Sequence, residues 1–182
     1  MTTELQDDIA ALRVYGPSFG LMRCLWLSGQ HEEAAVMANG LVARETARLE
    51  VSRKTSREAW ANQVFRVIWC HLVGGNRRSA RITLLMALDE TGTFDVSGAA
   101  LLSLQLAAWF VGDLQLIERA KQIHGGIAGG LSSRLLQAST EELRSIADEL
   151  QTYVAAAPVP ESSDSWHHTI LAEINDRLTT AR

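Results

Sequence analysis

The sequence predicts an all-α fold, and three observations support this prediction. Apolar residues recur at spacings of three and four, as on one face of a helix, and no segment shows sustained alternation of period two. The chain has only three prolines, so residues 18–157 can be helical without a proline break. Three helix-like segments close on a glycine, at Gly29, Gly75 and Gly112, and a second helix-like segment follows each glycine.

In the first half of the chain, each predicted helix has an apolar face and a residue that suits one of its ends. Pro17 suits the first turn of the second helix, and Gly29 suits the position after its end. Thr55 or Ser56 is the predicted N-cap of the fourth helix, and Asn76 that of the fifth. The helices are predicted over about residues 4–15, 17–28, 30–52, 57–73 and 77–90, with apolar faces that contain Leu5, Ile9 and Leu12; Phe19, Met22 and Leu25; Ala34, Ala38, Leu41 and Val42; Trp60, Val64 and Val67; and Ala80, Leu84 and Leu88.

In the second half, residues from about 97 to 111 are apolar nearly all round, which predicts a central buried helix. Asp113 starts its partner helix, which continues to about His124 and ends before the glycine-rich run 125–130. Three more helices are predicted over about residues 131–138, 140–154 and 166–180.

The chain is predicted to consist of one domain and an additional helix. Residues 1–154 form the helical repeat domain, and residues 155–165, which include Pro158 and Pro160, form a linker. Residues 166–182 form a C-terminal amphipathic helix. This helix could lie in a groove of its own chain, or dock on a second copy to give a homodimer.

Small residues recur at fixed distances from the three glycines, with one exception. An alanine follows both Gly29 and Gly75 by five residues, whereas Ile117 stands at that distance after Gly112. Five residues before the glycines stand the small residues Cys24, Cys70 and Ala107. A small residue at a recurrent position indicates close packing of helices, and we therefore assign the cysteines to packing and not to thiol chemistry.

With these turns the chain resembles tetratricopeptide repeats, in which a glycine followed by Asp or Asn joins two helices. The resemblance covers about residues 17–128 and implies stacked antiparallel helix pairs, a tetratricopeptide-like α-solenoid, with extra N- and C-terminal helices. The glycines are 46 and 37 residues apart, against about 34 in the family, and its early tryptophan and late proline are absent. The order of elements also resembles the chaperones of type III secretion, which implies a concave groove that holds a segment of another protein.

Basic residues are concentrated between Arg44 and Arg81. This segment contains nine basic and three acidic residues, whereas the rest of the chain contains eight basic and eighteen acidic residues. The asymmetry indicates either a docking site for an acidic or phosphorylated partner or solvated helix faces balanced by acidic neighbours in the fold. The predicted partner-binding residues are Arg44, Arg48, Arg66, Arg77 and Arg78, together with Trp69 and Trp109.

The two tryptophans fall in the first helices of predicted pairs, and first helices line the concave face in tetratricopeptide arrays. The alternative is that both rings fill the core. Arg77 and Arg78 stand at the start of a helix, where basic charge opposes the helix dipole, and this unfavourable placement suggests a function.

The sequence predicts no catalytic, cofactor or metal site. Its five histidines lack a ligand spacing such as HExxH, and its two cysteines lack CxxC spacing. The glycine-rich run 125–130 has neither a following Lys-Ser/Thr nor a preceding strand, so it is not a phosphate loop. We therefore expect a protein that is not an enzyme.

The predicted function is the binding of a peptide or helix of a partner protein in a concave helical groove, as in a bacterial secretion-type chaperone. One alternative is a regulatory module that binds nucleic acid or a phosphorylated or acidic partner through the basic segment; another is a structural subunit of a larger complex. The net charge of −4 speaks against a general nucleic-acid binder. An acidic N-terminus and the lack of an apolar run of about 18 residues predict a cytoplasmic protein without membrane contact.

Overall fold

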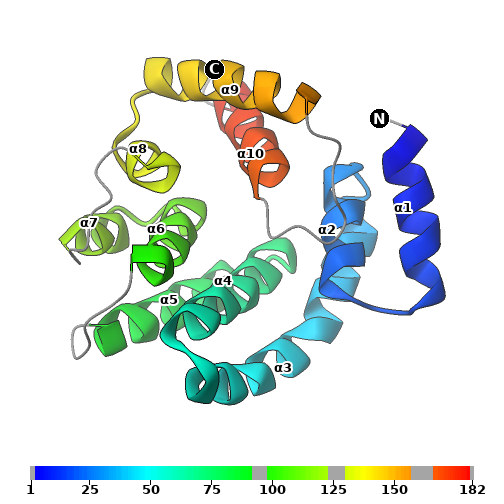
Figure 1. Ribbon diagram of the computed structural model, residues 1–182, viewed down its shortest axis with the longest axis horizontal. Coiled ribbons are helices and arrows are strands. Elements are labelled where there is room, and N and C mark those ends of the chain that lie inside the picture. Colours follow the sequence, from blue (N-terminus) through cyan, green and yellow to red (C-terminus); the bar gives the residue numbers. More distant parts are fainter. Residues whose placement is uncertain (1–2, 92–97, 123–129, 157–165, 181–182) are drawn as a thin grey trace. The chain divides into compact units, whose positions relative to one another are not determined.

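The computed structural model describes residues 3–91, 98–122, 130–156 and 166–180 (Figure 1). Within these ranges every regular element is a helix, which confirms the all-α prediction. Residues 157–165 of the predicted linker and residues 125–129 of the glycine-rich run lie outside them. The elements are α1 (Thr3–Val14), α2 (Phe19–Leu27), α3 (His31–Thr55), α4 (Arg57–Val73), α5 (Arg77–Thr91), α6 (Gly98–Val111), α7 (Leu114–Gln122), α8 (Leu131–Gln137), α9 (Thr140–Ala156) and α10 (His167–Thr180).

The helices belong to two compact units. The first unit contains the described parts of Met1–Ala34 and Ala138–Arg182, and the second contains those of Ala35–Gln137. The first unit therefore joins helices from both ends of the chain, and the division between the units falls inside α3.

In the second unit, α4 packs against both α5 and α6, and α6 also packs against α7 and α8 (Figure 1). The side chains of residues 104–111 in α6 are all buried, as expected of the central helix predicted there. Phe110 of this helix contacts Phe65 of α4, with ring centroids 5.7 Å apart. Apolar burial of this kind is the main source of stability in a helical unit.

Between the paired helices the chain turns at Gly29, Gly75 and Gly112. These glycines have left-handed backbone conformations, with φ of 81°, 78° and 71°. At Gly29 the glycine N–H donates to Trp26 and the next N–H to the carbonyl of Leu25. The same pair of bonds recurs at Gly75, where the acceptors are Leu72 and His71. Both turns are Schellman motifs, which satisfy carbonyls at a helix end. At Gly112 a single bond to Ala108 replaces the pair.

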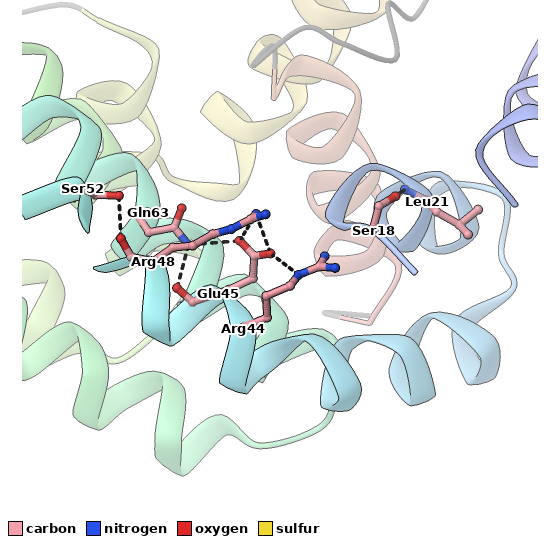
Figure 2. Close-up of polar contacts among 7 residues, drawn as sticks. All are labelled: Ser18, Leu21, Arg44, Glu45, Arg48, Ser52 and Gln63. Carbon is pink, nitrogen blue, oxygen red and sulfur yellow. Dashed lines mark hydrogen bonds and ion pairs between the residues drawn. The ribbon is translucent and has the colours of Figure 1, made fainter. Parts of the chain in front are cut away.

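The residues predicted to start α4, α5 and α7 cap these helices. The Ser56 hydroxyl accepts from the N–H of Ala59, and the side chains of Asn76 and Asp113 accept from backbone N–H groups in the first turns of α5 and α7. Such caps satisfy N–H groups that have no partner within the helix. The start of α2 differs from its prediction, because the Ser18 hydroxyl accepts from Leu21 and is the N-cap (Figure 2). Pro17 therefore precedes the cap and is not in the first turn.

In the first unit, α10 packs against α9 and α2. The buried Arg23 of α2 donates through Nε to the Thr169 hydroxyl, at 3.1 Å, and its guanidinium lies 5.0 Å from the centre of the Trp166 ring. Trp166 also meets Phe19 edge to face. The start of α10 is thus fixed on α2 by one polar and two aromatic contacts.

Acidification is expected to weaken this first unit through His168. Its Nδ1 is buried without a hydrogen-bond partner among the described atoms. Burial first, and then the charges of Arg23 and His167, lower its pKa from the usual 6.5. The unfolded chain therefore takes up a proton more readily than the folded unit, so stability that is complete above pH 6.5 is lost as the pH falls below it.

This pH dependence can be measured as the midpoint of thermal unfolding at about pH 8 and about pH 5. The His168→Gln variant should show a smaller fall between these values than the unaltered protein. The matched control is His31→Gln, which changes an exposed histidine of the same unit and should leave the fall in place. An equal fall in the His168→Gln variant would contradict the assignment.

Candidate partner-binding surface on α3

The side chain of Glu45 is fully buried in the second unit. A buried carboxylate is costly unless charged and hydrogen-bonding groups surround it. Arg48 donates through Nη1 to both carboxylate oxygens, at 3.0 and 3.3 Å, and Arg44 approaches Oε1 through Nε, at 3.4 Å. Gln63 of α4 donates to the other oxygen at 3.0 Å and to the Glu45 carbonyl at 2.8 Å. Figure 2 shows Glu45 between the two arginines.

Helix geometry explains why these groups meet. Arg44 and Arg48 are one turn apart on α3, and Glu45 lies next to this line on the side that faces α4. The two arginine side chains are 45% and 51% exposed, whereas the side chain of the acid is fully buried. The cluster thus combines a buried negative charge with two half-exposed positive charges.

Cys70 of α4 lies within the electrostatic reach of the same group. Burial, followed by the negative charge of Glu45, raises the pKa of its thiol to about 12, whereas Arg44 and Arg66 act in the opposite direction. Both cysteines of the chain are buried, and neither forms a disulfide. A thiol with such a pKa is almost entirely protonated near neutrality and is a poor nucleophile, which agrees with a packing role for this small residue.

The arginines at the start of α5 connect it to the turn between α6 and α7. Arg77 donates to the carbonyl of Val111, the last residue of α6, at 3.3 Å. Arg81 pairs with Asp113 at 2.6 Å, and this contact is the main reason why the pKa of Asp113 lies below its usual value. Arg78 is exposed on the same turn. The positive charge of Arg77 opposes the dipole of α5, but it interacts favourably with the carbonyl end of α6. This contact gives the position of Arg77 a structural explanation.

A further part of the basic segment is also balanced by acids. Arg53 lies between Glu50, at 3.1 Å, and Glu90 of α5, at 2.6 Å. Glu90 and Asp113 both stand outside the segment 44–81, so folding brings them to it. Arg53 and Arg81 therefore agree with the second interpretation of the basic segment, in which solvated helix faces are balanced by acidic neighbours in the fold.

The two tryptophans of the predicted site lie in the core of the second unit. Trp69 is 2% and Trp109 is 3% exposed, and Trp109 packs edge to face on Phe110 with centroids 4.9 Å apart. Arg66 is partly exposed on α4, one turn before Cys70. The structure thus brings Arg44 and Arg48 together at Glu45 and leaves the indoles beneath the surface.

Sequence reasoning missed Glu45, Gln63 and Val51. Val51 is 66% exposed and follows Arg44 by seven residues, which places it on the same face of α3. The signal for Glu45 was present, because it continues the stripe of Ala34, Ala38 and Leu41 by one more turn. An acid on an apolar stripe, flanked by arginines one position before and three after, indicates a buried ion pair. We call the exposed side chains of Arg44, Arg48 and Val51 the α3 face.

Among the described residues, no group of three or more His, Cys, Asp or Glu side chains is arranged to hold a metal ion. None of the described helices combines the length and apolar character that crossing a membrane requires. Comparison of the chain with models of protein families, with curated proteins and with solved structures found no match.

Proposed function

We propose that this protein binds a segment of a partner protein without catalysing a reaction on it, and that the segment docks on the α3 face. The observation behind the proposal is that one face of α3 presents two arginines held by a buried acid and, one turn on, a large exposed aliphatic side chain. Charged groups that are already oriented, beside apolar surface, are the features that protein interfaces use.

Two features of the fold support the wider proposal of a repeat-like stack of helix pairs. The turns at Gly29 and Gly75 share one hydrogen-bond pattern, and Cys24, Cys70, Ala34 and Ala80 are all buried at equivalent positions around them. Repeat arrays present extended surfaces and commonly bind other chains. Two groups of the second unit support a role without catalysis: donors from three residues surround the Glu45 carboxylate, and the raised pKa of Cys70 disfavours its thiolate.

Site-specific photocrosslinking in the natural host tests this proposal. A photoreactive amino acid at position 51 should capture one protein, and that protein should form a complex of fixed stoichiometry with the purified chain. The control is position 36, an exposed valine of the same helix about 22 Å away along its axis. Capture of the same proteins from both positions, or of none from either, would contradict the proposed function.

A further inference from the structure

One side of α5 is exposed, although the helix packs against α4, α6 and α7. Four exposed residues follow one another on this side at spacings of four, four and three, which places them on one face of the helix. They are Arg78, Ile82, Met86 and Asp89, and we call them the α5 face. Ile82 is 45% and Met86 is 67% exposed, so two large apolar side chains lie between an arginine and an aspartate. Methionine and arginine are enriched in protein interfaces.

The two charges at the ends of the α5 face oppose the dipole of their own helix. Arg78 lies in the first turn of α5, next to the partial positive charge of the free N–H groups, and Asp89 lies in the last turn, next to the carbonyls. The contact with Val111 explains the position of Arg77, but Arg78 has no hydrogen bond or ion pair with any described residue. Asp89 pairs with Arg119 of α7, yet its side chain is 59% exposed, and a carboxylate can accept from a second guanidinium.

The order of residues along the α5 face is self-complementary. From the N-terminus it is basic, apolar, apolar and acidic, and an antiparallel second copy presents the reverse order. If the two faces meet about a twofold axis at the level of Leu84, Ile82 lies opposite Met86 of the second copy, and Arg78 lies level with its residues 89 and 90. Each charge then also lies near the end of the second helix whose dipole favours it. A second copy of this chain therefore matches both the charges and the apolar centre.

We propose that two copies of this protein associate through the α5 face, as an antiparallel pair of α5 helices with an apolar centre and two contacts between Arg78 and Asp89 of different copies. This surface differs from the α3 face and from the C-terminal helix, so the proposal does not depend on the proposed function. A helix of 15 residues is about 22 Å long, and the buried area is therefore below the roughly 800 Å² per partner of a stable interface. We expect a weak dimer, with a dissociation constant of about 10–100 μM.

Sedimentation equilibrium of the purified chain between about 10 and 500 μM tests the proposal. The chain should pass from monomer to dimer over this range and form nothing larger, because a twofold contact is closed. Arg78→Glu and Asp89→Arg should each weaken association by at least about tenfold, since like charges then meet at both ends of the helix pair. The control is Lys54→Glu, which makes the same change of charge as Arg78→Glu at an exposed residue of α3 and should weaken association by less than about twofold.

An equimolar mixture of the two charge variants gives the decisive result. In a mixed pair, the acidic replacement at position 78 meets the basic replacement at position 89, and the unaltered Arg78 and Asp89 of the two copies meet each other. Opposite charges are therefore joined at both ends. The mixture should dimerise within about twofold of the affinity of the unaltered protein, although neither variant does so alone. Misfolding of either variant could not produce this recovery.

A chain that stays monomeric at about 500 μM would overturn the proposal. Association that persists in Arg78→Glu, Asp89→Arg and Ile82→Ser would place the contact on another surface, such as the C-terminal helix, and would overturn it as well. A mixture that associates no better than its components would contradict the antiparallel pairing. If a photoreactive amino acid at position 82 captures a different protein and never a second copy, the α5 face belongs to another partner and the proposal fails.

Discussion

Replacing Gln63 by leucine is expected to destabilise the second unit by about 3 kcal/mol. Gln63 is buried and donates to the Glu45 carboxylate and to its carbonyl. Leucine fills a similar volume but donates no hydrogen bond, so a buried negative charge loses a partner that water cannot replace. The loss can be measured as the change in the free energy of unfolding from urea titration.

The Glu45→Leu variant completes a thermodynamic cycle with Gln63→Leu. Each single variant removes one hydrogen-bond partner of a buried polar group, whereas the double variant pairs two apolar side chains of suitable size. The double variant should therefore recover most of the loss and unfold within about 1 kcal/mol of the unaltered protein. Strictly additive losses would show that the two side chains stabilise the fold independently and would contradict this account of the pair.

Replacing Trp69 by alanine is expected to cost about 4 kcal/mol of stability, because its large side chain is almost completely buried in the second unit. The resulting cavity lies where α4 packs against its neighbours, so the surrounding helices can relax only in part. The midpoint of urea unfolding and the near-ultraviolet circular dichroism report the change. The control is Met86→Ala, which truncates a side chain that is 67% exposed on α5 and should cost less than about 0.5 kcal/mol.

This variant also separates the two roles that the sequence leaves open for Trp69. A residue of the core loses stability on truncation, whereas a residue that contacts a partner loses binding and keeps the fold. If Trp69→Ala keeps its unfolding midpoint but no longer binds a partner, the indole belongs to the binding surface and must become accessible there.

Local signals predicted the helices and most of their ends. Ser56, Asn76 and Asp113 cap helices through bonds to residues two or three positions away, so a short window of sequence contains all the information. The sequence predicts that α3 ends near Ser52, three residues before its observed end at Thr55, because the last turn of the helix is polar. The Ser52 and Thr55 hydroxyls donate to the carbonyls four residues before them, which lets polar residues continue the helix.

Contacts between distant residues could not be predicted in this way. Arg23 and Thr169 are 146 positions apart, and the sequence around either residue does not indicate that it contacts the other. The same holds for Arg81 with Asp113 and for Arg53 with Glu90. For this reason the sequence alone indicates a uniform surplus of positive charge in the basic segment. Spacing did place Arg44 and Arg48 together, since one helical turn separates them. Glu45 is buried at a position that continues the apolar stripe of α3. An acidic residue at such a position is easily assigned to the surface when only the sequence is considered.

The pairing of Glu45 with Gln63 also selects one register between α3 and α4. Each residue along a helix is rotated by about 100° from the last, so a slip of one position would present Arg44 or Thr46 to Gln63 in place of the acid. Apolar side chains tolerate such slips, whereas a buried polar pair is satisfied in one alignment alone. The doubly apolar variant can therefore match the stability of the unaltered protein and still sample more than one packing of these helices.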